Sequence, residues 1–197
     1  VWRAGGIAIP LNVASAESEW EHCLTSAGGT QVIVDEQTLG GIEGLCDRLA
    51  IRIATVSDTL TDSVSSLPEL SPARRAMIVF TSGTTSKPKG AVTTHGNIAA
   101  QIETLITAWE WHADDVIPLF LPLHHVHGII NVLSCALWAG ATVHAMPKLD
   151  LPALCAQVAA DTFSVFMAVP TIYVKLIDHL ENLEDEEVEG ICEGFAN

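Results

Sequence analysis

The chain contains the stretch Thr81-Ser82-Gly83-Thr84-Thr85-Ser86-Lys87-Pro88-Lys89-Gly90, which follows directly on the apolar run 76–80. The β-branched and aromatic residues of that run predict a buried strand, and the abrupt change to small hydroxylated residues predicts a loop that meets a ligand. Side-chain hydroxyls and free backbone N–H groups can surround phosphate oxygens, and Lys87 or Lys89 can neutralise their charge. The stretch therefore predicts a loop that binds a polyphosphate.

This loop differs from the commonest phosphate-binding loop in the order of its residues. A Walker-type loop requires the pattern G-x-x-x-x-G-K-[ST]. Here Lys89 precedes Gly90, and no Ser or Thr follows the lysine at once. An ordinary Ser/Thr-rich turn is the simpler alternative, but such a turn would not need two lysines beside the end of a strand. The loop is therefore expected to belong to another class of phosphate-binding protein.

The pattern T-S-G-T-T-x-K-P-K-G resembles the phosphate-loop signature of the acyl-adenylate-forming (AMP-binding) enzymes. This superfamily contains acyl-CoA synthetases, luciferases and the adenylation domains of peptide synthetases. Three further segments resemble family elements in the same order along the chain, at residues 4–12, 121–128 and 169–173. The resemblance extends from Ala4 to about Leu180, and it implies part of the N-terminal domain of an adenylate-forming enzyme.

The second of these segments indicates a subtype within the superfamily. It places the triplet His125-Val126-His127 before Gly128, between the segments 109–116 and 137–142. In this combination the residues look like those of malonyl-CoA synthetases. The resemblance thus implies part of an acyl-CoA synthetase that acts on malonate or another short-chain acid.

For such an enzyme the resemblance implies a reaction in two steps. A carboxylate attacks the α-phosphate of ATP to give an acyl-adenylate and pyrophosphate, and the thiol of coenzyme A then captures the acyl group. ATP, Mg²⁺ and coenzyme A are the implied cofactors, and a small carboxylic acid is the implied partner. Matched residue by residue, the family's nucleotide-binding positions fall on Thr81, Ser82, Gly83, Thr84, Thr85 and Lys89, its catalytic positions on Lys89 and His125, and its carboxylate-binding positions on His125 and His127.

Ser86 departs from the family pattern, which most often has glycine at this position. If the backbone there required a positive φ, a serine would cost about 1–2 kcal/mol. We therefore expect phosphate binding to be weakened at this loop but not abolished.

The histidines and the nearby aromatic and acidic residues have simpler explanations. His125 and His127 form an H-x-H pair, but no third or fourth ligand lies at a recognisable spacing, so no metal site is predicted. Histidines that cap a buried helix at Gly128 remain an alternative for His127 and for His124.

Two further pairs, Trp109 with Trp111 and Asp114 with Asp115, are also explained more simply by structure than by function. The tryptophans lie at the end of an amphipathic helix pattern, which is more typical of packing than of a ligand platform. The aspartates precede a strand with no positioned proton acceptor, which favours a solvated turn over an acid–base pair.

The negative charge of the chain is concentrated near its C-terminal end. The formal net charge is −15, and residues 181–197 contain seven acidic side chains and no Lys or Arg, which leaves −15 + 7 = −8 for the rest. Phosphate backbones require clustered Lys and Arg, so no nucleic-acid partner is expected. We predict a domain over residues 1–183 and a disordered acidic tail over residues 184–197.

The five cysteines form no C-x-x-C pair, which favours free thiols in a reducing compartment. No apolar run reaches the roughly eighteen residues of a membrane span, and no signal peptide is visible. The expected location is intracellular, either cytoplasmic or mitochondrial.

The apolar pattern alternates between strand and helix periods, which predicts an α/β fold of βαβ units around a largely parallel sheet. The expected strands cover residues 7–9, 31–34, 51–56, 77–80, 91–94, 116–121, 142–145 and 164–168. The expected helices cover residues 18–27, 37–49, 96–109, 128–137, 151–160 and 171–183.

Several family elements have no counterpart before Asn197: the adenine-binding Y-G-x-T-E element, the ribose-binding Asp, the hinge and the C-terminal catalytic Lys. We therefore expect these 197 residues to bind nucleotide weakly at best and to form no acyl-CoA. One alternative is a truncated, non-catalytic product that acts as an interaction module or has no function. Another is part of a peptide-synthetase adenylation domain, against which the pattern His125-Val126-His127 weighs.

Overall fold

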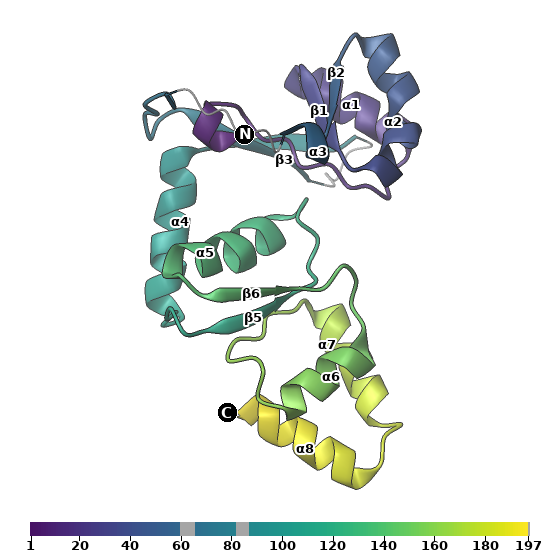
Figure 1. Cartoon of the computed structure of the whole chain (residues 1–197), viewed down its shortest axis with the longest axis vertical. Coiled ribbons are helices and arrows are strands. Elements are labelled where there is room, and N and C mark those ends of the chain that lie inside the picture. The colour runs from purple at the N-terminus through teal and green to yellow at the C-terminus, as the bar shows by residue number, and fades with distance from the viewer. Residues whose placement is uncertain (60–65, 82–86, 197) are drawn as a thin grey trace. The chain divides into compact units, whose positions relative to one another are not determined.

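The computed structural model describes residues 1–59, 66–81 and 87–196 of the chain. The chain divides into two compact units, Val1–Ile98 and Ala99–Asn197. The strands described form three two-stranded sheets, of which two are parallel and one is antiparallel (Figure 1). Because helices connect the parallel strands, the predicted α/β class with βαβ units is confirmed.

The first unit contains one complete βαβ element. Strands β1 (Gln31–Val34) and β2 (Arg52–Thr55) pair in parallel, and helix α2 (Glu36–Leu49) connects them. Helix α2 begins where the Asp35 carboxylate accepts a hydrogen bond from the backbone N–H of Thr38, at 2.7 Å, and this bond lowers the pKa of Asp35. The short helix α3 (Val56–Thr59) follows β2.

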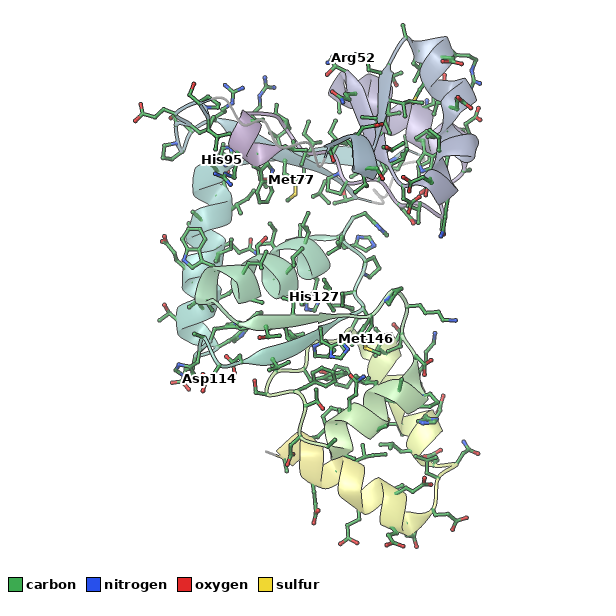
Figure 2. All side chains as sticks on the ribbon, in the orientation of Figure 1. Arg52, Met77, His95, Asp114, His127 and Met146 are labelled. Atoms are coloured by element: carbon green, nitrogen blue, oxygen red, sulfur yellow. The ribbon has the colours of Figure 1, made fainter. Side chains whose placement is uncertain are left out.

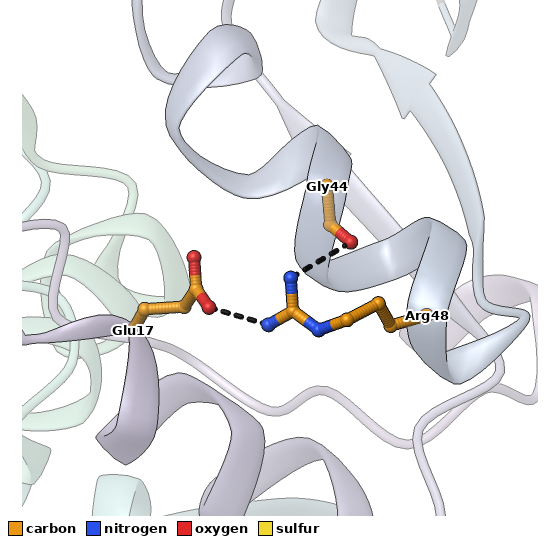
Figure 3. Close-up of polar contacts among 3 residues, drawn as sticks. All are labelled: Glu17, Gly44 and Arg48. Atoms are coloured by element: carbon orange, nitrogen blue, oxygen red, sulfur yellow. Dashed lines mark hydrogen bonds and ion pairs between the residues drawn. The ribbon is translucent and has the colours of Figure 1, made fainter.

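Helix α1 (Glu17–Ala27) packs against this element and ends at Gly28, which adopts a left-handed conformation with φ of 65°. The shared hydrophobic core consists of Trp20, Leu24, Val32, Val34, Ile42, Leu45 and Cys46. On the surface, the guanidinium of Arg48 donates to the Glu17 carboxylate and to the Gly44 carbonyl (Figure 3). Such an exposed ion pair contributes about 0.2–1 kcal/mol, so the apolar core holds α1 to α2.

An antiparallel hairpin completes the first unit. Strand β3 (Arg75–Thr81) pairs with β4 (Lys89–Thr94), and residues 76–79 of β3 are buried. The N-terminal segment, which includes the short helix η1 (Trp2–Ala4), lies along β3: the Trp2 indole donates to the Ala76 carbonyl, and Ala8 forms a parallel bridge to Met77. The predicted strand at residues 7–9 is reduced to this bridge, because Pro10 has no N–H to extend a ladder.

The second unit contains another βαβ element, preceded by helix α4 (His95–Ala108), which begins in the first unit. Strands β5 (Val116–Leu119) and β6 (Thr142–Ala145) pair in parallel. The connection consists of a π-helix, η2 (His127–Ser134), and a short α-helix, α5 (Cys135–Ala139). This connection was predicted as one buried helix, but Leu137 is 66% exposed.

Three helices form the rest of the second unit: α6 (Leu151–Ala159), α7 (Pro170–Leu180) and α8 (Asp185–Ala196). Their core consists of Leu154, Cys155, Val158, Leu176 and Ile191. The Phe166 ring meets those of Phe120, Tyr173 and Phe195 at centroid distances of 5.8, 5.8 and 5.2 Å.

Helix α8 corrects the prediction of a disordered acidic tail at residues 184–197. Asp185, Glu186 and Glu187 lie in its first turn, where negative charge is favoured by the helix dipole. Ile191 is buried, and a Cβ on Gly194 would lie 2.1 Å from the Val158 carbonyl oxygen. The acidic segment is therefore packed closely against α6.

The predicted strand at residues 164–168 is also wrong. The backbone N–H groups of Ser164 and Val165 both donate to the single carbonyl of Val116. The Ser164 hydroxyl bonds both the backbone N–H of Val116 and the Asp115 carboxylate. Because two amides share one carbonyl, the regular hydrogen bonds of a β-ladder do not form here. The segment contacts β5 through these two amides and the Ser164 side chain.

Among the residues that the structure describes, no helix has both the length and the apolar character to cross a membrane.

The cysteines are free thiols, and four of the five are buried. Burial raises the pKa of Cys23, Cys46 and Cys155 and raises that of Cys135 to about 11. Cys192 on α8 is exposed.

We expect Gly194→Ala and Gly190→Ala, on the same helix, to have opposite effects. The methyl group at position 194 would collide with the backbone of α6 and lower the free energy of unfolding by about 1–3 kcal/mol. At position 190 nothing lies within 4 Å, so alanine should raise stability by up to about 1 kcal/mol. Urea unfolding of the two variants measures the difference, and equal stabilities would contradict the packing of α8 on α6.

Alkylation by iodoacetamide at about pH 8 should modify Cys192 first and Cys135 last. The raised pKa keeps Cys135 protonated, and its thiolate fraction grows about tenfold per pH unit until the pH passes about 11. Mass spectrometry of digested samples gives the order of labelling. Cys192→Ser is the control that should remove the fast phase, and labelling of Cys135 at the rate of Cys192 would contradict its burial.

Candidate functional site

The hairpin brings together the two ends of the predicted phosphate loop. Thr81 is the register partner of Lys89, and Phe80 that of Gly90. The Thr81 hydroxyl lies 3.4 Å from the Lys89 carbonyl oxygen, to which it donates. Ser82, Gly83, Thr84 and Thr85, with Ser86, lie outside the described residues. Of the predicted nucleotide-binding residues, the structure thus places Thr81 beside Lys89.

Two cationic side chains lie at this end of the hairpin. Lys87 and Lys89 are both exposed, and neither forms an ion pair with any residue in the described part of the chain. Their ammonium groups therefore retain the full capacity to bind an anion.

Gly90 is required by close packing inside the hairpin. A Cβ at this position would lie 2.8 Å from the Ile78 Cγ2 atom and 3.3 Å from the Phe80 ring. The last glycine of the loop pattern therefore allows the Phe80 side chain to lie across β4.

A histidine that the sequence analysis missed touches the same place. On α1, the Nε2 atom of His22 lies 2.9 Å from the Pro88 carbonyl oxygen. The ring of His22 meets that of Phe80 edge-on, with a centroid distance of 6.1 Å. The two partners are 66 and 58 positions away in the sequence, and no local pattern indicated this contact.

The other predicted site residues follow the carboxyl end of β5. The N–H of His125 donates to the Pro122 carbonyl, at 3.2 Å, and forms a tight turn. His125 is exposed and lies against His124, with ring centroids 4.2 Å apart and ring planes tilted by 52°. His127 is half-buried and begins η2 (Figure 2). The two predicted carboxylate-binding histidines therefore lie two residues apart, His125 in the turn after β5 and His127 at the start of η2.

Gly128 fixes the shape of this turn. A Cβ here would lie 2.4 Å from the Pro122 carbonyl oxygen and 2.9 Å from that of Leu121. No side chain fits at this position, because backbone atoms cannot yield as a flexible side chain does. The glycine after the histidines is thus a requirement of the fold.

Of the tryptophan and aspartate pairs, Trp111 and Asp115 have structural roles, whereas Trp109 is exposed. Trp111 is 6% exposed, but Trp109 is 46% exposed and so is not a core residue. Asp115 accepts hydrogen bonds from the His112 N–H and from the Ser164 hydroxyl, each at 2.7 Å. Asp114 lies in the turn before β5 (Figure 2). The carboxylate of Asp115 therefore supports the turn.

Within residues 1–59, 66–81 and 87–196, no three His, Cys, Asp or Glu side chains are grouped so that they could hold a metal ion.

The two groups of candidate residues belong to different units but occupy similar local positions. The loop follows β3 in the first unit, and the histidines follow β5 in the second. In α/β folds, ligands bind beyond the carboxyl ends of the strands. Each unit therefore offers a candidate ligand-binding edge.

Comparison with known proteins identifies the class of protein to which these candidate residues belong. The AMP-binding enzyme family matches residues 1–190 of the chain, so the chain belongs to that family. The predicted resemblance to the superfamily is confirmed.

Two groups of relatives resemble the chain over most of its length. It is 36% identical over 190 residues to malonate–CoA ligase ACSF3, mitochondrial, of Mus musculus, covering 91% of this chain and 33% of that protein. The structure of ATP-bound MatB from Rhodopseudomonas palustris matches with a TM-score of 0.82 at 28% identity, covering 95% and 39%. A malonyl-CoA ligase complex with methylmalonyl-CoA and AMP matches with a TM-score of 0.79 at 28% identity, covering 98% and 40%. The chain thus spans about a third of the length of the curated relatives it matches.

Gly128→Ala should disrupt the histidine turn. Because the added methyl group meets two carbonyl oxygens, we expect the free energy of unfolding to fall by about 1–3 kcal/mol or more. Gly40→Ala in α2 is the matched control, since nothing lies within 4 Å of its Cβ position. Urea denaturation compares the two, and an unchanged midpoint for Gly128→Ala would show that the turn tolerates a side chain.

Proposed function

We propose that this chain provides the ATP-phosphate and carboxylate sites of an AMP-forming acid–thiol ligase. The pairing of Thr81 with Lys89 carries the proposal, because it holds the backbone at the two ends of the loop side by side and so presents Lys89 where the loop closes. The family membership and the names of the relatives support the same reaction class.

In the first step a carboxylate oxygen forms a bond to the α-phosphorus of ATP. The bond from that phosphorus to the bridging oxygen breaks, and pyrophosphate leaves with the electron pair. The difficulty of this step is charge, because an anion approaches a polyanion while another anion departs. We assign the β- and γ-phosphates to the loop that begins at Thr81, with Lys89 as the cation that stabilises the departing pyrophosphate. Ser82, Gly83, Thr84 and Thr85 complete this assignment from the sequence.

In the second step the sulfur of coenzyme A bonds to the acyl carbon, AMP leaves with the electrons of the acyl–oxygen bond, and the thiol proton is lost to solvent. We assign His125 and His127 to the carboxylate pocket. Their position beyond β5, in the turn and at the start of η2 where Gly128 packs against the Pro122 carbonyl, supports this assignment.

Mg²⁺ accompanies ATP in reactions of this class and neutralises phosphate charge. Thr81, Lys87 and Lys89 offer a hydroxyl and two cations but no carboxylate, so these residues do not themselves form a magnesium site. The nucleotide would bring the metal to the loop.

The names of the relatives favour malonate as the substrate. The mouse relative is a malonate–CoA ligase, and a matching structure is a malonyl-CoA ligase with methylmalonyl-CoA bound. We also propose an intracellular location, with the mitochondrion favoured by the name of the mouse relative and free thiols consistent with a reducing compartment.

Malonate should stimulate ATP–pyrophosphate exchange by the product of the complete reading frame, and Lys89→Ala should reduce the exchange by about a hundredfold. The reduction follows from the loss of one charged donor to the departing pyrophosphate. Lys175→Ala, an exposed lysine of α7, is the control that should leave the rate unchanged.

A panel of dicarboxylic, monocarboxylic and amino acids in the same assay separates the alternatives. Exchange with amino acids alone would indicate a peptide-synthetase adenylation domain, and no exchange with any acid would favour a non-catalytic product. Exchange that survives Lys89→Ala at nearly the full rate would overturn the assignment of the lysine.

A further inference from the structure

His22 joins α1 to β3 and to the residue that precedes β4, at the two ends of the phosphate loop. Its Nε2 atom lies 2.9 Å from the carbonyl oxygen of Pro88, the residue before Lys89. Its ring lies against Phe80, the residue before Thr81, at 6.1 Å and an interplanar angle of 72°. One side chain thus contacts the neighbours of both residues that close the loop.

The chemistry of the partners fixes the proton on His22. A carbonyl oxygen only accepts, so Nε2 must carry the hydrogen and donate it to Pro88. In the neutral ring Nδ1 is then an acceptor for the Ser26 hydroxyl, which lies 3.3 Å away. In the charged ring Nδ1 would donate to the same oxygen. The bond to Pro88 is possible in both states, so substitution rather than pH is the means of testing it.

The backbone on both sides of Lys89 is held by hydrogen bonds from side chains. Strand β4 begins at Lys89, so the Pro88 carbonyl lies outside the β-ladder and has His22 as its side-chain partner. The next carbonyl along the chain, that of Lys89, accepts from the Thr81 hydroxyl. The two peptide carbonyls that flank the Lys89 Cα are therefore each held by a side chain from another element.

We infer that His22 is a positioning residue for the phosphate site: it holds the backbone at Lys89 so that the ammonium group meets the phosphates of ATP. This inference rests on the proposed function, since it concerns the same lysine. His22 itself does not touch the nucleotide in this role; it acts through Pro88 and Lys89.

Two substitutions at His22 separate the contributions of its hydrogen bond and of its ring. His22→Phe keeps a ring against Phe80 but removes the donor, and His22→Gln keeps a donor near the position of Nε2 but removes the ring. In ATP–pyrophosphate exchange with the product of the complete reading frame, we expect His22→Phe to lower the rate about threefold to tenfold, the range for loss of one neutral hydrogen bond. His22→Gln should stay within about twofold of the unaltered protein. His112→Phe, an exposed histidine of the other unit, is the matched control and should have no effect.

A double-substitution cycle tests whether His22 acts through Lys89. If it does, His22→Phe should have no further effect in a Lys89→Ala background, and the KM for the carboxylate should not change. A rate for His22→Phe equal to that of the unaltered protein would overturn the inference. A full additional loss in the Lys89→Ala background would also overturn it, because His22 would then act on the fold as a whole.

The rate of the Lys89→Ala variant distinguishes failure of the proposed function from failure of the inference about His22. Unimpaired exchange after Lys89→Ala, or no exchange by the unaltered protein, would overturn the proposed function and this inference with it. Exchange that depends on Lys89 but not on His22 would overturn the inference alone.

Discussion

The register of β3 against β4 is the constraint on which the first unit depends. Residues 76–79 of β3 are buried, and hydrogen bonds tie the strand to Ala8 on one edge and to β4 on the other. A slip of one residue would bring a side chain to the place of Gly90, where a Cβ would lie 2.8 Å from the Ile78 Cγ2 atom, so the register is strongly specified. The register in turn decides which residues lie opposite each other at the loop, namely Thr81 and Lys89. The N-terminal segment takes its position from this strand through Trp2, and α1 contacts the strand through the rings of His22 and Phe80.

Local patterns were sufficient to predict the elements whose boundaries depend on nearby residues. Strands β1 and β6 lie where the sequence predicted them, because short β-branched runs are bounded there by turn residues. Helix α2 begins one residue earlier than predicted, where Asp35 provides the cap. The loop pattern and the histidine motif were also visible, since both are continuous in the sequence. Their glycines, Gly90 and Gly128, have the close backbone approaches that such positions require.

Features that depend on distant residues could not be predicted in this way. The contact of His22 with Pro88 joins segments 66 positions apart and leaves no periodic signal. The strand expected at residues 164–168 failed because Val116 offers one carbonyl to two amides. Helix α8 lies where the run of negative charge predicts disorder. Its apolar residues Val188, Ile191 and Phe195 in fact have helical spacing, and this signal could have identified it.

The π-helix η2 allows the connection between β5 and β6 to differ in length between related chains. A π-turn holds more residues than an α-turn, so η2 accommodates additional chain between β5 and β6 without lengthening the connection in space. The hydrogen bond from the Cys135 N–H to the Ile130 carbonyl, five residues back, marks this wider turn. A related chain that is one residue shorter here can close the same connection as an ordinary α-helix. The gap in an alignment with such a chain therefore belongs inside η2 after His127, and His125 and His127 keep their correspondence.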